Sequence, residues 1–538
     1  METRAFLAIA LSILVLVIYQ EWISRYYGTP APPVSSPPEK EAEKSEAPKP
    51  TPPVARTQSA PATVPTTTEG KDISVDTDNY VAIFTTQGAR FKSFKFKKYC
   101  TAVDEKSPPF EIVSSTQGVP LPLGVRWQSP TPFDDAGLLY TVNGSDLKLT
   151  GESEGKLLFQ GQTPNGFVIT KQFAFSGSTY PIQMEVGVQA PKGSAPAPEI
   201  LLTEKSDQTE PNPDAHFEGV IALVDNKIKR EPAAEANKGQ EFTGDIAWEG
   251  FGHTYFFFGL LPENGAQHKL SLHASGPALI AAIAGPPASP GAVSRYTVFI
   301  GPKELNTLKS LGRGLERSID FGYFGFISIP FLYVLHFFHG FTKSYGIDII
   351  LLTVLIKVLT APLTHKSYVS MKQMQKLQPQ MERLKEKLSD DKEKLNKEIM
   401  ELYRRNGVNP LGGCWPMLLQ LPVFYGLYAS LSTPIELRHA PFLWIKDLSR
   451  PDWQSLPFTL GSWHLGIPIL TLLMGASMFL QQWMTPSAGD PNQRKMMLMM
   501  PLMFTFMFVS FPAGLTVYWL VNNILTIGQQ YWISRRDQ

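Results

Sequence analysis

The sequence predicts an α-helical polytopic membrane protein that carries an all-β soluble domain. Long apolar runs occupy the first 25 and the last 220 of its 538 residues, whereas the region between them is polar and repeats with a period of two. Basic and acidic residues are balanced, 49 against 48, so no nucleic-acid footprint is present. We therefore expect no direct nucleic-acid binding.

The amino-terminal segment, residues 1–27, predicts a transmembrane signal anchor. Arg4 precedes an apolar run, and bulky Trp22 and Tyr26 follow it where a cleavable signal has small residues. We predict an uncleaved helix with its amino end in the cytoplasm; a cleaved signal is the alternative. Residues 28–70 are rich in Pro, Glu, Lys, Ser and Thr, which predicts a disordered linker.

Residues 71–302 predict an antiparallel β-sandwich, because short β-branched and aromatic runs alternate with Gly, Pro, Asn and Asp turns. In "YPIQMEVGVQ" one strand face is apolar: Ile182, Met184, Val186 and Val188. Aromatic residues are concentrated in segment 248–262, and a ligand site there is the alternative interpretation. Core packing is the preferred interpretation.

Residues 303–342 predict an interfacial or re-entrant segment. Leucines and an isoleucine recur at steps of three and four between 305 and 319, as in an amphipathic helix on a membrane surface. The run 321–341 is apolar enough to cross. A crossing, however, would place the loop 365–412, with eleven Lys and Arg, outside, against the positive-inside rule.

Residues 343–538 predict five transmembrane helices, which make six with the anchor: 347–363, 415–432, 465–484, 496–511 and 513–533. The loop 434–464, predicted outside, has only three Lys and Arg. In the loop 365–412, apolar residues step by three and four on either side of a turn. This loop therefore predicts a cytoplasmic helical hairpin.

The first of these five helices carries a buried cation on a polar face. One helix face collects four polar residues: Thr353, Lys357, Thr360 and Thr364. A charge inside hydrocarbon costs at least ~2.5–3.5 kcal/mol, so it faces water, a partner or a cavity. Snorkelling of Lys357 to the headgroups is the alternative. Gln420 and Asn522 add polar groups from other helices, which together predict a hydrated interior; interhelical bonding alone is the other reading.

The sequence contains no motif for covalent or metal chemistry. It lacks "GxxxxGK[ST]", "HExxH", "GxSxG" and "CxxC". Cys100 and Cys414 are too few for a disulfide framework, and His336 with His339 lacks a third metal ligand. We expect no catalytic residue, no metal and no cofactor.

Four segments resemble the YidC/Oxa/Alb family of membrane protein insertases: "KVLTAPLTHKSYVSMKQMQKLQP", "VNPLGGCWPMLLQLPVFYGLYASL", "ELRHAPFLWIKDLS" and "FPAGLTVYWLVNNILTIGQQ". The match covers about residues 320–531, and "FIGPKE" with the β domain resembles the Gram-negative type, whose periplasmic domain is a β-supersandwich. The resemblance implies an insertase and chaperone for nascent inner-membrane proteins, without covalent chemistry. It implies a hydrophilic groove open to cytoplasm and lipid.

The resemblance also matches residues to that groove. Lys357 falls at the position of the groove cation, where the family usually has Arg, and the aromatic pair is Tyr-Trp where Tyr-Tyr is common. Lysine keeps the charge but loses the planar fork of arginine. With the polar residues found above, the predicted substrate groove comprises Lys357, Thr353, Thr360, Gln420, Tyr518, Trp519 and Asn522.

The resemblance implies a multi-pass protein of the bacterial inner membrane, with the amino terminus cytoplasmic and the large domain periplasmic. Implied partners are nascent membrane proteins, the Sec translocon, the ribosome and signal-recognition-particle machinery, and membrane lipids; we expect a monomer. One alternative is a solute transporter with an external carbohydrate-binding β domain. It predicts paired repeats with broken helices, which the sequence lacks. A purely structural chaperone is the other alternative.

Overall fold

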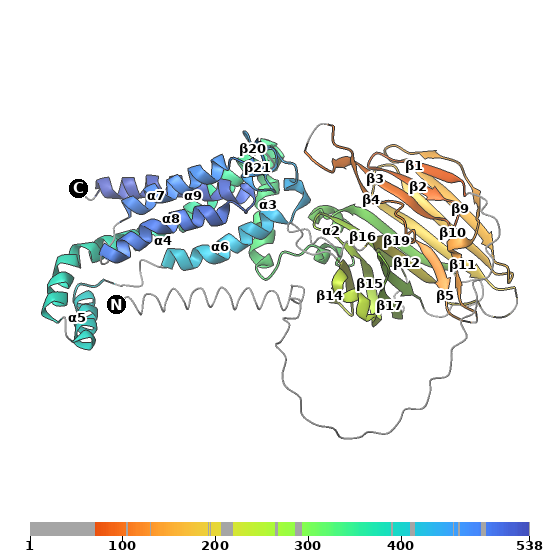
Figure 1. Cartoon of the computed structure of the whole chain (residues 1–538), viewed down its shortest axis with the longest axis horizontal. Coiled ribbons are helices and arrows are strands. Elements are labelled where there is room, and N and C mark those ends of the chain that lie inside the picture. Colours follow the sequence, from red (N-terminus) through yellow and green to blue (C-terminus); the bar gives the residue numbers. More distant parts are fainter. Residues whose placement is uncertain are drawn as a thin grey trace, which may run out of the picture. The chain divides into compact units, whose positions relative to one another are not determined.

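The computed structural model describes most of the chain from Gly70 onward: residues 70–103, 106–129, 131–191, 193, 195–205, 219–263, 267–285, 293–388, 391–408, 415–455, 457–460, 463–485 and 491–536. The predicted anchor, and the predicted linker apart from Gly70, lie outside these residues. In the described chain, a β domain precedes a set of helices (Figure 1). The β-sandwich and the helical core predicted from sequence are both present.

The β domain consists of a five-stranded sheet, in the order β4-β3-β2-β1-β8, and a fourteen-stranded sheet. Its strand pairings are antiparallel except that of β1 with β8. The strands are β1 (Asp72–Asp76), β2 (Tyr80–Thr85), β3 (Arg90–Cys100), β4 (Pro109–Val113), β5 (Gly124–Trp127), β6 (Phe133–Asp134), β7 (Thr141–Asn143), β8 (Leu147–Lys148), β9 (Glu154–Gln162), β10 (Val168–Ser176), β11 (Pro181–Gln189), β12 (Glu199–Lys205), β13 (Gly219–Val224), β14 (Lys227–Pro232), β15 (Gln240–Gly252), β16 (Phe256–Pro262), β17 (Gln267–Ser275), β18 (Ala278–Ala284) and β19 (Val293–Pro302).

Alternating burial along the strands builds the core of this domain. The apolar face predicted in β11 is buried, since Ile182, Met184, Val186 and Val188 are each at most 4% exposed. In the aromatic segment, Trp248 and Phe257 are fully buried and lie edge to face, 5.5 Å apart. Core packing of this segment is confirmed.

A buried ion cluster joins the two sheets. Lys171 on β10 contacts Asp135 with 2.6 Å between Nζ and Oδ2, and Arg90 on β3 contacts the other carboxylate oxygen at 2.5 Å. The Tyr140 hydroxyl also donates to Asp135. Burial alone would raise the pKa of Asp135, but the two cations outweigh it and lower that pKa.

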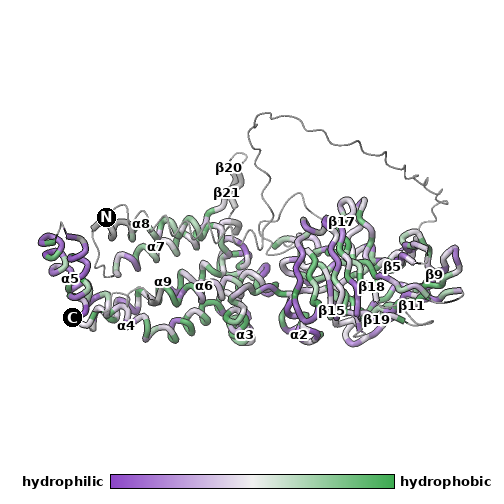
Figure 2. The backbone as a smooth tube through the Cα atoms, turned by 90° about the horizontal axis from the view of Figure 1, so that it is seen from below, coloured by the Kyte–Doolittle hydropathy of each residue, from purple (hydrophilic) through white to green (hydrophobic). Residues whose placement is uncertain are grey.

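The helices that follow are α2 (Leu305–Leu311), α3 (Gly325–Thr342), α4 (Tyr345–Lys387), α5 (Lys392–Arg405), α6 (Trp415–Ser432), α7 (Ile469–Met484), α8 (Pro491–Phe508) and α9 (Ala513–Arg536), with a small hairpin of β20 (Pro457–Leu460) and β21 (Trp463–Gly466) before α7. Helix α9 packs against α4, α6 and α7, so it is central to the helical core. Helices α6, α7 and α8 are largely hydrophobic along their length, whereas α5 is hydrophilic (Figure 2).

The amphipathic helix expected between residues 305 and 319 is instead broken into α2 and a short 3-10 helix. Gly312, Arg313 and Gly314 all have positive φ, and such left-handed residues cannot continue a right-handed helix. Leu305 and Leu308 are buried in the core of the β domain. Protein therefore covers the apolar face predicted for a membrane surface, while the interfacial placement of residues 303–342 as a whole stays a prediction.

The expected transmembrane segment 415–432 has the same ends as α6, whereas the other four correspond to helices with different ends. Helix α4 runs without interruption from the predicted segment 347–363 into the predicted hairpin, with Pro362 and Pro379 inside it. Leu465, the expected start of another segment, lies in β21, and α7 begins only after Pro468. Proline lacks an amide hydrogen, which suits a helix start.

Within the described residues, two helices have the length and composition of a membrane span: α3 and α4. Three shorter apolar stretches lie in α6, α7 and α8. The two histidines of α3 each face a carboxylate, with His336 3.2 Å from Glu436 and His339 2.7 Å from Asp348. The number and direction of crossings stay predictions.

Candidate functional site

The buried lysine of α4 binds a side chain on the neighbouring helix α9. Lys357 Nζ donates to Thr526 Oγ1 at 2.7 Å, and the Thr526 hydroxyl donates in turn to the main-chain oxygen of Asn522 at 2.6 Å. The side chain of Lys357 is half-buried. Among the described residues the ammonium group therefore has one hydrogen-bond acceptor, Thr526, and two of its three hydrogens are available for other acceptors.

The threonines on the same face of α4 form hydrogen bonds within their own helix, whereas Lys357 bonds to α9. Thr353 Oγ1 donates to the Ile349 carbonyl at 2.6 Å, and Thr360 Oγ1 donates to the Ile356 carbonyl at 2.9 Å. These bonds return to the helix itself, as threonine hydroxyls in apolar helices commonly do. Thr353 is buried and Thr360 half-buried. Both keep the face polar without linking α4 to another helix.

A second polar pair joins α6 to α9. Gln420 Nε2 donates to the Tyr518 hydroxyl at 2.5 Å, and Tyr518 is fully buried. The next residue, Trp519, packs its ring against Phe424 at 5.5 Å and Phe508 at 5.0 Å. The aromatic pair therefore splits its roles: the tyrosine supplies a polar contact and the tryptophan an apolar one.

The structure thus places the predicted residues in two groups that share α9. Lys357 and Asn522 meet through Thr526, and Gln420 meets Tyr518. In the described part of the chain, no hydrogen bond connects one group with the other.

Sequence reasoning did not assign Thr526 to the site, although it assigned Asn522, one helical turn earlier on α9. It missed Asn523, whose Nδ2 donates to Ser477 Oγ on α7 at 3.0 Å. Gln529 Nε2 donates to the Ala361 carbonyl at 3.1 Å. The spacing of four residues between Asn522 and Thr526 puts both on one face of α9, and this is the signal that could have found Thr526. No comparable repeat marks Ser477.

An exposed apolar flank accompanies these polar groups. On α8, Met499, Leu502, Met503 and Phe506 are each at least 61% exposed. On α6, Leu418 and Leu421 are more than half exposed. Apolar surface of this extent marks a contact with lipid or with another apolar partner.

The arrangement suits binding. Across the described residues, no group of three His, Cys, Asp or Glu side chains could hold a metal ion. Lys357 offers a cation, and the half-buried Gln420 offers a neutral polar group. Such a set attracts an acidic or polar segment through charge and hydrogen bonds.

Comparisons with known proteins cover nearly the whole chain. Residues 72–334 match a family model described as "YidC periplasmic domain", and residues 337–538 match one described as "60Kd inner membrane protein". A Syntrophus aciditrophicus protein named "Membrane protein insertase YidC" is 39% identical over 563 residues and covers 100% of both chains. The chain belongs to the YidC family of membrane protein insertases.

The chain is also similar to two further proteins. A protein of the same name from Geobacter sp. is 39% identical over 478 residues, covering 86% of each chain. A solved structure titled "Active YidC insertase crystal structure with the first transmembrane domain resolved" is 18% identical, with a TM-score of 0.39, and covers 86% of this chain and 92% of that one. As a member of this family, the chain is an inner-membrane protein.

Proposed function

We propose that this protein inserts nascent proteins into the bacterial inner membrane and helps them fold, without covalent chemistry. Family membership gives the class of activity. The observation that carries the mechanism is the Lys357 ammonium group, which faces α9 and binds Thr526 in the helical core. The cation supplies an attractive point for a polar segment that must leave water.

In this proposal, Lys357, Thr353, Thr360, Gln420, Tyr518, Trp519 and Asn522 line a hydrophilic groove open to the cytoplasm and to lipid. An acidic tail approaches Lys357 and exchanges part of its hydration for a charge-assisted hydrogen bond. The adjoining apolar segment of the substrate meanwhile lies against exposed side chains such as Met503 and Phe506 on α8. Polar and apolar parts of one substrate are thus accommodated side by side.

We infer the topology from charge. The hairpin formed by the end of α4 and by α5 lies in the cytoplasm, and the β domain lies in the periplasm, since the basic residues concentrate in the hairpin. The amino-terminal anchor, with its amino end cytoplasmic, completes six transmembrane helices. The Sec translocon, the ribosome and the signal-recognition-particle machinery are the partners expected from the family resemblance.

The test reconstitutes the purified full-length protein into liposomes and follows protease protection of a single-span substrate. An insertase protects the membrane segment of the substrate in proteoliposomes and not in protein-free liposomes. Equal protection in both would contradict the proposal. Protection that appears only when the Sec translocon is added would instead support an assembly chaperone. A solute transporter would release a trapped sugar and leave the substrate unprotected.

A further inference from the structure

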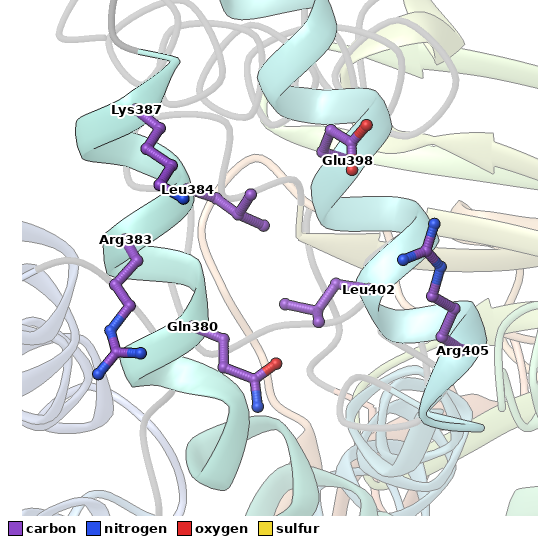
Figure 3. Close-up of a pocket in the computed structure, with 7 residues that line it drawn as sticks. All are labelled: Gln380, Arg383, Leu384, Lys387, Glu398, Leu402 and Arg405. Carbon is purple, nitrogen blue, oxygen red and sulfur yellow. The ribbon is translucent and has the colours of Figure 1, made fainter.

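A cleft separates the two helices of the cytoplasmic hairpin. It has a volume of about 230 Å³ and lies between the end of α4 and α5. Figure 3 shows Leu384 and Leu402 pointing toward each other across this space, with polar side chains around them. The lining residues are Gln380, Arg383, Leu384, Lys387, Glu398, Leu402 and Arg405.

The rim of the cleft is positively charged. The lining residues include three cations, Arg383, Lys387 and Arg405, but only one carboxylate, Glu398. Arg405 already contacts Glu401 at 2.6 Å. Arg383 and Lys387 are exposed, and within residues 365–388 and 391–408 neither forms an ion pair. Two cations of α4 are therefore available to an anionic partner.

Leu384 and Leu402 form an apolar floor in the cleft, and this floor restricts the chemical class of the partner. Inorganic phosphate would use the cations but leave Leu384 and Leu402 uncovered, and a flat bilayer surface does not enter a cleft between two helices. A polypeptide carries carboxylates and apolar side chains next to each other. A carboxylate binds the planar guanidinium of Arg383 through two hydrogen bonds, and an adjacent apolar side chain covers the two leucines.

We propose that this cleft binds an acidic segment of a polypeptide that contains apolar residues, and that it is the first contact of a substrate tail before the tail reaches Lys357. The second half of this inference rests on the proposed function. The first half, binding of an acidic peptide, does not depend on it.

The distance along α4 between Lys357 and Arg383 sets the length of substrate tail that can contact both sites. Arg383 lies 26 residues beyond Lys357 on the same helix, which corresponds to about 39 Å at ~1.5 Å per residue. The prolines inside α4 bend the path, so this is an upper limit. An extended chain of about 12 residues spans that distance at ~3.3 Å per residue. A tail of about 12 extended residues is therefore long enough to contact both sites at once, and tails much shorter than this fall short.

The first experiment measures binding of a fluorescent acidic peptide, with alternating Glu and Leu, to the full-length protein in nanodiscs of neutral lipid. The variant Arg383→Gln/Lys387→Gln is expected to weaken binding at least tenfold. The control Lys394→Gln/Lys397→Gln removes the same charge from exposed positions of α5 outside the cleft and is expected to weaken binding less than twofold. Equal weakening by both variants, or none by the first, would overturn the proposal.

A second variant keeps the test independent of folding. Gln380→Glu adds one carboxylate to the cleft at an exposed position and is expected to weaken peptide binding several-fold. Anionic vesicles form the other arm. If Arg383→Gln/Lys387→Gln abolishes vesicle binding but leaves peptide binding unchanged, the cleft is a lipid site and the proposal fails.

Insertion assays separate this inference from the proposed function. Substrates with acidic tails of about 8 and about 20 residues bracket the 12-residue estimate. The Arg383→Gln/Lys387→Gln variant is expected to slow insertion of the long-tailed substrate and to leave the short-tailed one unchanged. Equal effects on both would overturn the capture step. If neither substrate depends on the protein at all, the proposed function fails while peptide binding still reports on the cleft.

Discussion

Lys357 on α4 and Thr526 on α9 form a hydrogen bond across the helix interface, with 2.7 Å between Nζ and Oγ1. They are separated by 169 residues in sequence. The bond holds the ammonium group toward α9, with Thr526 anchored by the main chain of Asn522. This contact positions the cation of the proposed substrate attraction, and it contributes to the packing of α4 on α9.

Thr526→Val is expected to destabilise the helical core. The substitution keeps the shape of the side chain but removes the acceptor for Lys357, a loss of about 1.5–3 kcal/mol for a bond to a charged group. Thr526→Ser, which keeps the hydroxyl, is the control. The thermal unfolding midpoint in detergent is expected to fall for the valine variant and to stay near the parent value for serine. A valine variant as stable as the parent would show that the bond contributes nothing.

Tyr518→Phe is expected to destabilise the helical core by about 1–3 kcal/mol, because it leaves the half-buried Gln420 amide without its partner. The matched control is Tyr531→Phe on the same helix, where the side chain is half exposed. The control is expected to change stability by less than about 0.5 kcal/mol. Chemical unfolding of the two variants side by side measures the difference. Indistinguishable midpoints would argue against a structural role for the Gln420 contact.

Asp135→Asn is expected to destabilise the β domain by about 3–5 kcal/mol, since Lys171 and Arg90 would lose their shared buried counter-charge. Glu185→Gln, which breaks the exposed pair with Arg295, is expected to cost at most about 1 kcal/mol. Hydrogen exchange of β-domain amides in the full-length protein reports both changes. Equal exchange rates in the two variants would contradict the role given to the cluster.

The stability of the β domain is expected to fall as pH rises from about 4.5 to 8. Glu249 is fully buried between β13 and β16, and burial raises its pKa from 4.5 to about 8. Its folded form therefore holds a proton that the unfolded chain has lost, so the stabilisation is complete below pH 4.5 and lost as pH passes 8. Glu249→Gln should flatten this dependence. Exchange rates corrected for intrinsic chemistry test it, and an unchanged slope in the variant would refute the assignment to Glu249.

Much of the architecture follows from sequence periodicity. The alternation in β11 placed Ile182 and Met184 in the core, and the apolar run around Lys357 predicted a helix that the structure contains. Helix ends were harder to predict, because hydropathy averages over many residues. The break at Gly312 and Gly314 depends on backbone conformation, which apolar spacing does not report.

The helix on which each candidate residue lies was predictable from sequence, but the contacts between the candidate residues were not. Spacing on α4 identified Lys357, and the family resemblance identified Tyr518. Which side chain each one meets depends on how α4, α6 and α9 pack, and that packing joins residues far apart in the chain. The cleft at Leu384 and Leu402 likewise forms only when two amphipathic helices come together.

The most direct measurement compares Lys357→Ala, Lys357→Gln and Lys357→Arg in proteoliposomes, with one substrate that has an acidic tail and one that has a neutral tail. Protease protection of the acidic-tailed substrate should fall at least tenfold in the alanine and glutamine variants and stay near the parent value in the arginine variant. The neutral-tailed substrate should change little. Equal protection of the acidic-tailed substrate in all variants would contradict the account, because insertion would then not depend on the charge at residue 357.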